Sequence, residues 1–164
     1  MDRTTNLLGA VALALSDQLK SDMADAFDRS GETAAAVVVL GYAPGLSVET
    51  LRQVISRSHP GTVRLIDRLA EDGLVERRKA EDRRAVALYL TEPGEQLRRQ
   101  LMKSRLLMLE KSLSGLTEDE RRVLGELLSR VLSNLPKTEM DKHRICRLCS
   151  TPTCKDCPIP GHAI

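Results

Sequence analysis

The chain has 164 residues, a length that fits one domain or one domain with an extension. Its net charge is only +2 at pH 7, so the overall charge does not by itself indicate a nucleic-acid partner. Aromatic residues make up 2% of the chain, whereas leucine, alanine and valine are abundant, which is typical of a helical protein. No apolar run is long enough to span a bilayer, so we expect no membrane partner and a cytoplasmic protein with reduced thiols.

The first predicted element is one long amphipathic helix. Its apolar residues recur at four-residue spacing, which is one face of an α-helix: Leu7, Val11, Leu15, Leu19, Met23 and Phe27. Only Arg3 supplies positive charge ahead of this stretch, and Asp2 offsets it, which argues against a signal peptide.

A short buried helix and a turn follow. Residues 33–40 (TAAAVVVL) are apolar on nearly every side, which predicts a helix enclosed by other elements. Residues 41–45 (GYAPG) are predicted to form a turn, because proline fixes the backbone there and glycine frees it. Ser47 is expected to cap the next helix.

The next predicted helix begins near Ser58, a predicted N-cap, with Pro60 in the first turn. Its core face is predicted to consist of Val63, Ile66 and Leu69, with Leu65 partly exposed. Thr62, Arg64 and Arg68 are expected to point away from that core. Gly73 fits a left-handed helix end.

A hairpin and two more helices complete the predicted order. Residues 74–79 and 85–90 alternate as strands do, joined by a charged loop. Thr91 is expected to cap a helix that runs to about Leu113. Thr117 is expected to cap a last amphipathic helix, which Pro136 ends.

Two helices, a recognition-type helix and a charged hairpin follow one another as in a winged helix-turn-helix. The run 59–97 resembles the MarR family of bacterial transcriptional regulators in four motifs: RLIDRL, GLVERR, the Asp82-x-Arg84 of the wing, and LTEPG. The resemblance covers roughly residues 5–135. It implies a mainly α winged helix-turn-helix with a two-stranded β-hairpin wing and long dimerisation helices. It also implies an obligate homodimer that binds double-stranded DNA at a near-palindromic operator.

The resemblance and the element pattern together predict the organisation of the chain. The expected parts are a winged-helix domain in 1–135, with dimerisation helices in 1–30 and 95–135 and a DNA-binding lobe in 32–92, a polar linker in 136–142 and a cysteine-rich extension in 143–164.

The predicted DNA contacts come from the start and outer face of the recognition helix and from the wing. They are Ser58, His59, Gly61, Thr62, Arg64, Arg68, Asp82, Arg83 and Arg84. Gly61 would let the backbone approach DNA, and Arg84 suits a narrow, electronegative minor groove. The resemblance implies that Asp82 holds the wing arginine in position. For His59, a phosphate contact and an inconsequential exposed position both remain open, and the alternative for the wing charges is a merely solvated hairpin.

All four cysteines lie within twelve residues, as C-x2-C-x4-C-x2-C: Cys146, Cys149, Cys154 and Cys157. In a reducing compartment such pairs favour metal ligands or redox groups over structural disulfides. Two pairs can complete a tetrahedral zinc site, which is the leading interpretation. An iron–sulfur cluster, a dithiol switch and an inert tail are the alternatives. The extension is not part of the MarR pattern, so the resemblance implies nothing about its role.

We therefore expect a sequence-specific DNA-binding regulator, a repressor associated with the nucleoid, and no enzyme. The three histidines lie apart and no glycine-rich phosphate loop is present. Its small-molecule effector, if one exists, is unknown, and the scarcity of aromatic residues gives little support to a phenolic one. The alternative function is an iron–sulfur or thiol redox protein that uses the winged helix to dock another protein.

Overall fold

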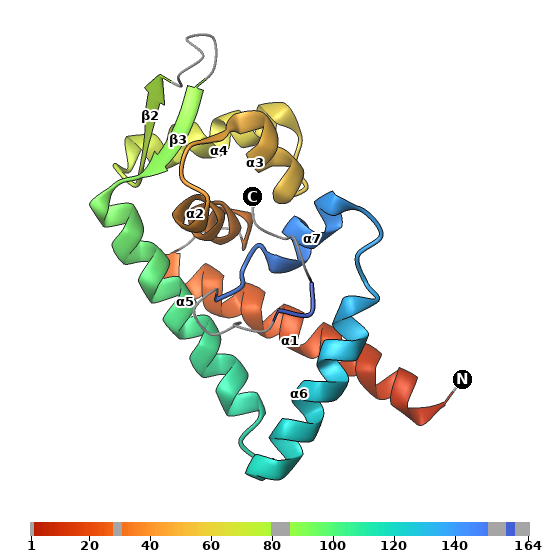
Figure 1. Ribbon diagram of the computed structural model, residues 1–164. Helices are drawn as coiled ribbons and strands as arrows, with labels where there is room; N and C mark the ends of the chain where they lie inside the picture. The colour runs from red at the N-terminus through yellow and green to blue at the C-terminus, as the bar shows by residue number, and fades with distance from the viewer. Residues whose placement is uncertain (1, 28–30, 80–85, 151–156, 160–164) are drawn as a thin grey trace.

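The computed structural model describes residues 2–27, 31–79, 86–150 and 157–159. Seven helices and three strands lie within these residues: α1 (Arg3–Phe27), α2 (Gly31–Tyr42), β1 (Leu46–Ser47), α3 (Val48–Val54), α4 (His59–Glu71), β2 (Val75–Lys79), β3 (Val86–Leu90), α5 (Glu92–Ser112), α6 (Glu118–Ser133) and α7 (Glu139–Cys146). Figure 1 shows a lobe of α2, α3, α4 and the sheet above three long helices, α1, α5 and α6. The predicted mainly α, winged-helix fold is confirmed.

Helix α2 forms the centre of the lobe. Every residue from 33 to 40 is buried, as the all-round apolar run predicts. The helix continues to Tyr42, so the turn predicted at 41–45 starts later than expected. Gly41 stays helical beside α5, where an added Cβ would lie 2.0 Å from the Cδ atom of Arg98.

The sheet has three antiparallel strands in the order β1-β3-β2, so the predicted two-stranded hairpin is incomplete. The third strand is only the pair Leu46–Ser47, which faces Leu88 and Ala87 of β3. Gly45 allows this approach with a φ of +89°, and its N–H donates to the Leu88 carbonyl at 2.8 Å. Two residues are too short for an alternating pattern, which explains why the sequence does not predict β1.

The predicted helix caps are confirmed. The hydroxyls of Ser47, Ser58, Thr91 and Thr117 each accept the N–H of the residue three positions on. Gly73 has a φ of +69° just beyond α4, as a left-handed helix end requires.

Helix α5 starts against Leu74, the residue before β2, and this contact requires a glycine. The Thr91 N–H donates to the Leu74 carbonyl at 3.1 Å. A Cβ added to Gly94, in the next turn, would lie 2.1 Å from the same Leu74 oxygen. Backbone atoms therefore block any side chain at Gly94.

The substitution Gly94→Ala is expected to lower the free energy of unfolding by about 1–3 kcal/mol, because overpacking forces the backbone to move. This loss should appear although alanine is favoured over glycine inside a helix. Urea unfolding followed by circular dichroism measures it. The control is Gly115→Ala, where an added Cβ meets nothing within 4 Å. Equal stability of both variants would contradict the close approach.

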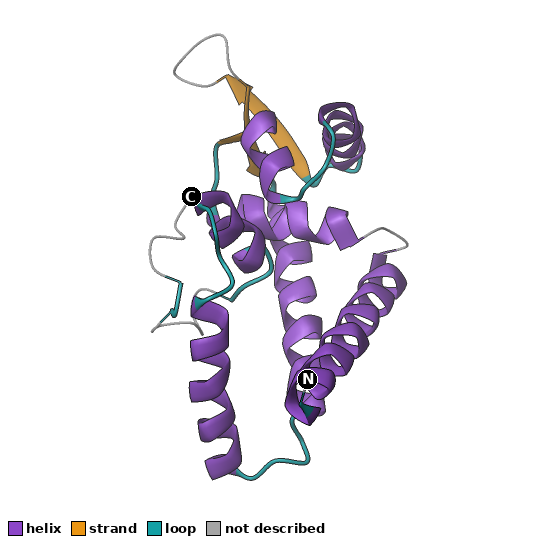
Figure 2. Ribbon diagram, turned by 90° about the vertical axis from the view of Figure 1, so that its right-hand side faces the viewer, coloured by secondary structure: helices purple, strands orange, loops and turns teal. Residues whose placement is uncertain are grey.

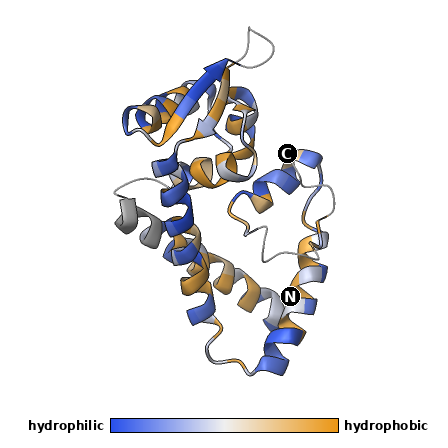
Figure 3. Cartoon of the chain, turned by 60° about the vertical axis from the view of Figure 1, so that its left-hand side comes forward, coloured by the Kyte–Doolittle hydropathy of each residue, from blue (hydrophilic) through white to orange (hydrophobic). Residues whose placement is uncertain are grey.

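The three long helices leave much apolar surface uncovered. Figures 2 and 3 show α5 and α6 running away from the wing to a loop at the opposite end, with apolar residues on α1, α5 and α6. The exposed large apolar side chains of these helices and their continuation are Leu7, Leu8, Val11, Leu13, Leu106, Leu107, Val123, Leu127, Leu128, Val131 and Leu135. Among the helices that the structure describes, none is long and apolar enough to cross a membrane.

Residues 136–142, predicted as a polar linker, contain the start of helix α7. Thr138 and Asp141 form a capping box: the Thr138 hydroxyl accepts the Asp141 N–H at 3.2 Å, and the Asp141 carboxylate accepts the Thr138 N–H at 2.9 Å. Helix α7 packs on α3, and Cys146 and Ile159 are buried. The extension is therefore joined to the lobe.

Candidate nucleic-acid interface and cysteine segment

Helix α4 presents two arginines to solvent. Arg64 and Arg68 are exposed and lie one turn apart on the same face. In the described residues neither has an ion-pair partner. The opposite side of the helix packs on α3 and β2. The guanidinium groups are thus available to contact an external anion.

The predicted exposure of Thr62 and Leu65 is wrong. Both side chains are buried, Thr62 at 0% exposure, and the Thr62 hydroxyl donates to the Ser58 carbonyl at 3.0 Å. Helix α4 has packing partners on two sides, so its buried stripe is wider than one apolar ladder. Val63, expected in the core, is only half-buried. Thr62 cannot reach a base edge from this position.

The start of α4 carries three further predicted contacts. Ser58 and His59 are exposed, and the Ser58 hydroxyl caps the helix at 3.3 Å from the Gly61 nitrogen. The His59 Nδ1 atom lies 3.7 Å from a carboxylate oxygen of Glu49 on α3. An added Cβ at Gly61 would lie 3.0 Å from both Arg57 Nε and Ser58 Oγ. The absence of a side chain at Gly61 therefore leaves room for the side chains of Arg57 and Ser58.

An exposed ion pair joins the hairpin to helix α4. The Arg77 guanidinium of β2 donates to the Asp67 carboxylate of α4 at 2.6 Å. Arg78 lies over the ring of Tyr89, 4.4 Å from its centroid. Sequence reasoning missed these roles, although Asp67 and Arg77 belong to the RLIDRL and GLVERR motifs. The predicted wing contacts Asp82, Arg83 and Arg84 lie outside the described residues.

Three of the four cysteines lie within the described residues. Cys146 is buried, while Cys149 and Cys157 are half-buried. The Cys149 N–H donates to the Cys146 carbonyl at 2.8 Å, and the Ile159 N–H lies 3.4 Å from the Cys157 sulfur. Burial, then the nearby Cys149 and Cys157 thiols, raises the pKa of Cys146 to about 11.

Cys154, the fourth predicted ligand, lies outside the described residues. Among the residues that are described, no group of three or more histidine, cysteine or carboxylate side chains is placed to hold a metal ion. The four-cysteine metal site therefore stays a prediction.

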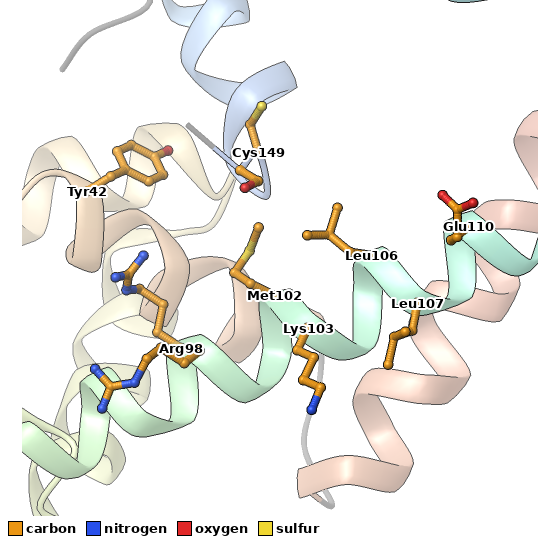
Figure 4. Close-up of a pocket in the computed structure, with 10 residues that line it drawn as sticks. Tyr42, Arg98, Met102, Lys103, Leu106, Leu107, Glu110 and Cys149 are labelled. Atoms are coloured by element: carbon orange, nitrogen blue, oxygen red, sulfur yellow. The ribbon is translucent and has the colours of Figure 1, made fainter. Parts of the chain in front are cut away.

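A pocket of about 820 Å³ lies between helix α5 and the two residues Cys149 and Ser150, which follow α7. Figure 4 shows Cys149 above Met102, with Tyr42 to one side and the Cys149 sulfur directed away from α5. Arg98, Arg99 and Lys103 supply positive charge to its wall. The Tyr42 hydroxyl is buried, with no hydrogen-bond partner among the described residues, and burial raises the pKa of Tyr42 above its usual range.

Comparison with known proteins places this lobe in one family. The family model described as "MarR family" matches residues 27–85, which include α2, α3, α4 and β2. The chain is 35% identical over 96 residues to the HTH-type transcriptional regulator YfiV of Bacillus subtilis, covering 56% of this chain and 60% of YfiV. It is 33% identical over 99 residues to the HTH-type transcriptional regulator BilQ of Clostridium symbiosum, covering 58% of this chain and 67% of BilQ. The chain belongs to the MarR family.

Solved MarR-family structures have the same fold. The apo form of wild-type MarR from Escherichia coli superimposes with a TM-score of 0.69 at 25% identity, covering 83% of this chain and 98% of that one. FabT of Streptococcus pneumoniae, solved in complex with DNA, gives a TM-score of 0.68 at 24% identity, covering 81% of this chain and 95% of FabT. The cysteine-rich extension, residues 143–164, lies beyond the residues that the family model matches.

Proposed function

We propose that the protein is a sequence-specific DNA-binding repressor that binds a near-palindromic operator as a homodimer. The observation that carries the proposal is the pair of exposed arginines Arg64 and Arg68 on α4, the helix whose Asp67 pairs with Arg77 of β2. Arginine on an exposed helix face suits bidentate contact with guanine in the major groove. The relatives named as transcriptional regulators, and FabT in complex with DNA, support this reading.

The apolar surface of the long helices supports the homodimer. No residue of α6, which is described in full, is buried, although it carries Val123, Leu127, Leu128 and Val131. A second copy of the chain would cover this face and place two α4 helices in successive major grooves, about 34 Å apart. Such a dimer represses by occupying the operator, which requires no contact with the polymerase.

The test is selection of duplexes from a random library by the full-length protein, followed by affinity measurements at several salt concentrations. We expect an inverted repeat and a steep loss of affinity with salt, with a slope of about −0.9 per phosphate contacted. A redox protein that uses the winged helix to dock another protein would enrich no duplex. That outcome, or salt-independent binding, would overturn the proposal.

We further propose that Cys146, Cys149, Cys154 and Cys157 bind one metal ion, zinc first. The spacing of the two Cys-x-x-Cys pairs supports it. The Ile159 N–H beside the Cys157 sulfur would stabilise a thiolate there. An iron–sulfur cluster or a dithiol switch are the competing occupants of the same cysteines.

Elemental analysis of protein purified without a metal-affinity tag is expected to give about one zinc per chain. Each of the four single Cys→Ser variants should lose most of this zinc, because a tetrahedral site needs every ligand. If the analysis finds iron and the protein absorbs visible light, the cysteines hold an iron–sulfur cluster and not zinc. Four free thiols and no metal would contradict metal binding altogether.

A further inference from the structure

Helix α7 packs on α3, the first helix of the helix-turn-helix (Figure 1). It lies beyond residues 27–85, which the family model matches, so membership of the family does not imply this contact. Met140 and Leu148 pack against the buried core of the lobe, and Cys146 is buried. Met140 and Arg144 are four residues apart, which places them on one face of the helix. Helix α7 therefore docks on the lobe with a defined face.

Arg144 makes a polar contact from this face with the end of α3. Its Nε atom donates to the Gln53 carbonyl at 3.0 Å, although the two residues are 91 positions apart in sequence. Gln53 lies in the last turn of α3, where the carbonyls have no regular intrahelical partner. The Ser56 N–H reaches the same carbonyl only at 3.4 Å. Because a cationic donor is favourable at this end of a helix, Arg144 supplies a bond that the local backbone makes only weakly.

The Gln53 carbonyl lies just before the turn that sets the direction of α4. This turn spans residues 55–58, between the end of α3 and the beginning of α4. Within it Ser56 has a φ of +56°, a left-handed conformation that is costly for a residue with a side chain. Contacts from other elements must hold such a turn. Two of them are the bond from Arg144 and the ion pair of Arg57 with Glu32 of α2, at 2.9 Å.

We propose that α7 is a positioning element of the DNA-binding lobe: Arg144 holds the end of α3, which fixes the turn and with it the orientation of α4 toward DNA. This inference rests on the DNA binding proposed above and requires no metal. A recognition helix contacts base edges only when it lies at the correct angle in the major groove. A loosened turn would spread α4 over several orientations, and apparent affinity falls with the fraction of molecules that are competent to bind.

The experiment compares Arg144→Met with the parent, both full length and kept reduced, because methionine is unbranched and cannot donate to the Gln53 carbonyl. Affinity is measured for a duplex that the parent selects from a random library and for an unrelated duplex. Hydrogen–deuterium exchange is followed at residues 55–62. In the variant we expect faster exchange there and about fivefold weaker binding of the selected duplex, at the low end of the usual coupling between two sites. Binding of the unrelated duplex and the dependence on salt should not change, because no phosphate contact is removed.

Three further variants separate the hydrogen bond from the charge. Arg144→Lys keeps a cationic donor and should recover most of the affinity and the slow exchange. Lys142→Met is the control: it removes one positive charge from α7 whose partner is Glu139 of the same helix, at 2.7 Å, and should bind the selected duplex as the parent does. Met140→Ala removes an apolar contact between α7 and the lobe without changing the charge, and its effect should have the same sign as that of Arg144→Met.

The outcomes are distinguishable. If Arg144→Met binds the selected duplex as tightly as the parent, the positioning role is overturned. An equal loss on both duplexes with a shallower salt dependence also overturns it, because Arg144 would then contact phosphate itself. Weaker binding without faster exchange overturns it as well, since the turn is not loosened. If the parent selects no duplex, the proposed DNA binding fails, and the exchange measurement decides separately whether α7 holds the turn.

Discussion

Replacing Arg64 and Arg68 together by alanine is expected to weaken operator binding by roughly 2–6 kcal/mol per half-site, at 1–3 kcal/mol per base contact. At least about thirtyfold should therefore be lost. Both side chains are exposed on α4 and have no ion pair among the described residues, so their removal costs no internal contact. A gel-shift titration at fixed salt measures the loss.

The matched control is Lys111→Ala combined with Lys137→Ala. It removes the same charge from exposed positions outside α4 and the hairpin. This control should keep most of the affinity, because long-range charge is screened at physiological salt. Unfolding by urea should be unchanged in both double variants. If the arginine variant binds as tightly as the parent, α4 does not enter the groove as proposed.

Leu127→Asp is expected to convert the protein from a dimer to a monomer. Leu127 is 52% exposed in the single chain, in the apolar face of α6. In a two-fold symmetric interface one substitution places two carboxylates in the contact, each desolvated without a partner, at a cost of several kcal/mol. Sedimentation should change from about twice 18.1 kDa to the single-chain mass. Operator binding should fall with it, since one lobe covers only a half-site.

Ser129→Asp serves as the control for this substitution. Ser129 is exposed on α6 two residues after Leu127, which places it on the opposite side of the helix. It adds the same charge without entering the apolar face, so the dimer should persist. A parent protein that sediments as a monomer and still binds an inverted repeat tightly would contradict the homodimer.

Features encoded within one or two helical turns can be predicted from the sequence. The caps Ser47, Ser58, Thr91 and Thr117 all occur where the sequence predicts them, because a cap binds an N–H only three residues away. The left-handed Gly73 and the buried run 33–40 are equally local. The four motifs between residues 59 and 97 also suffice to indicate the MarR family, which the family model over 27–85 confirms.

Only the tertiary structure decided which faces are covered. Thr62 and Leu65 are buried because α4 packs on both α3 and β2, and a one-stripe reading of the helix cannot show a second partner. Strand β1 exists only through its pairing with β3. The hydrogen bond from Arg144 to Gln53 joins residues 91 positions apart, and nothing local to either residue specifies the other. Pairing across such distances depends on how complete elements pack, so the placement of α7 beside α3 required the folded chain.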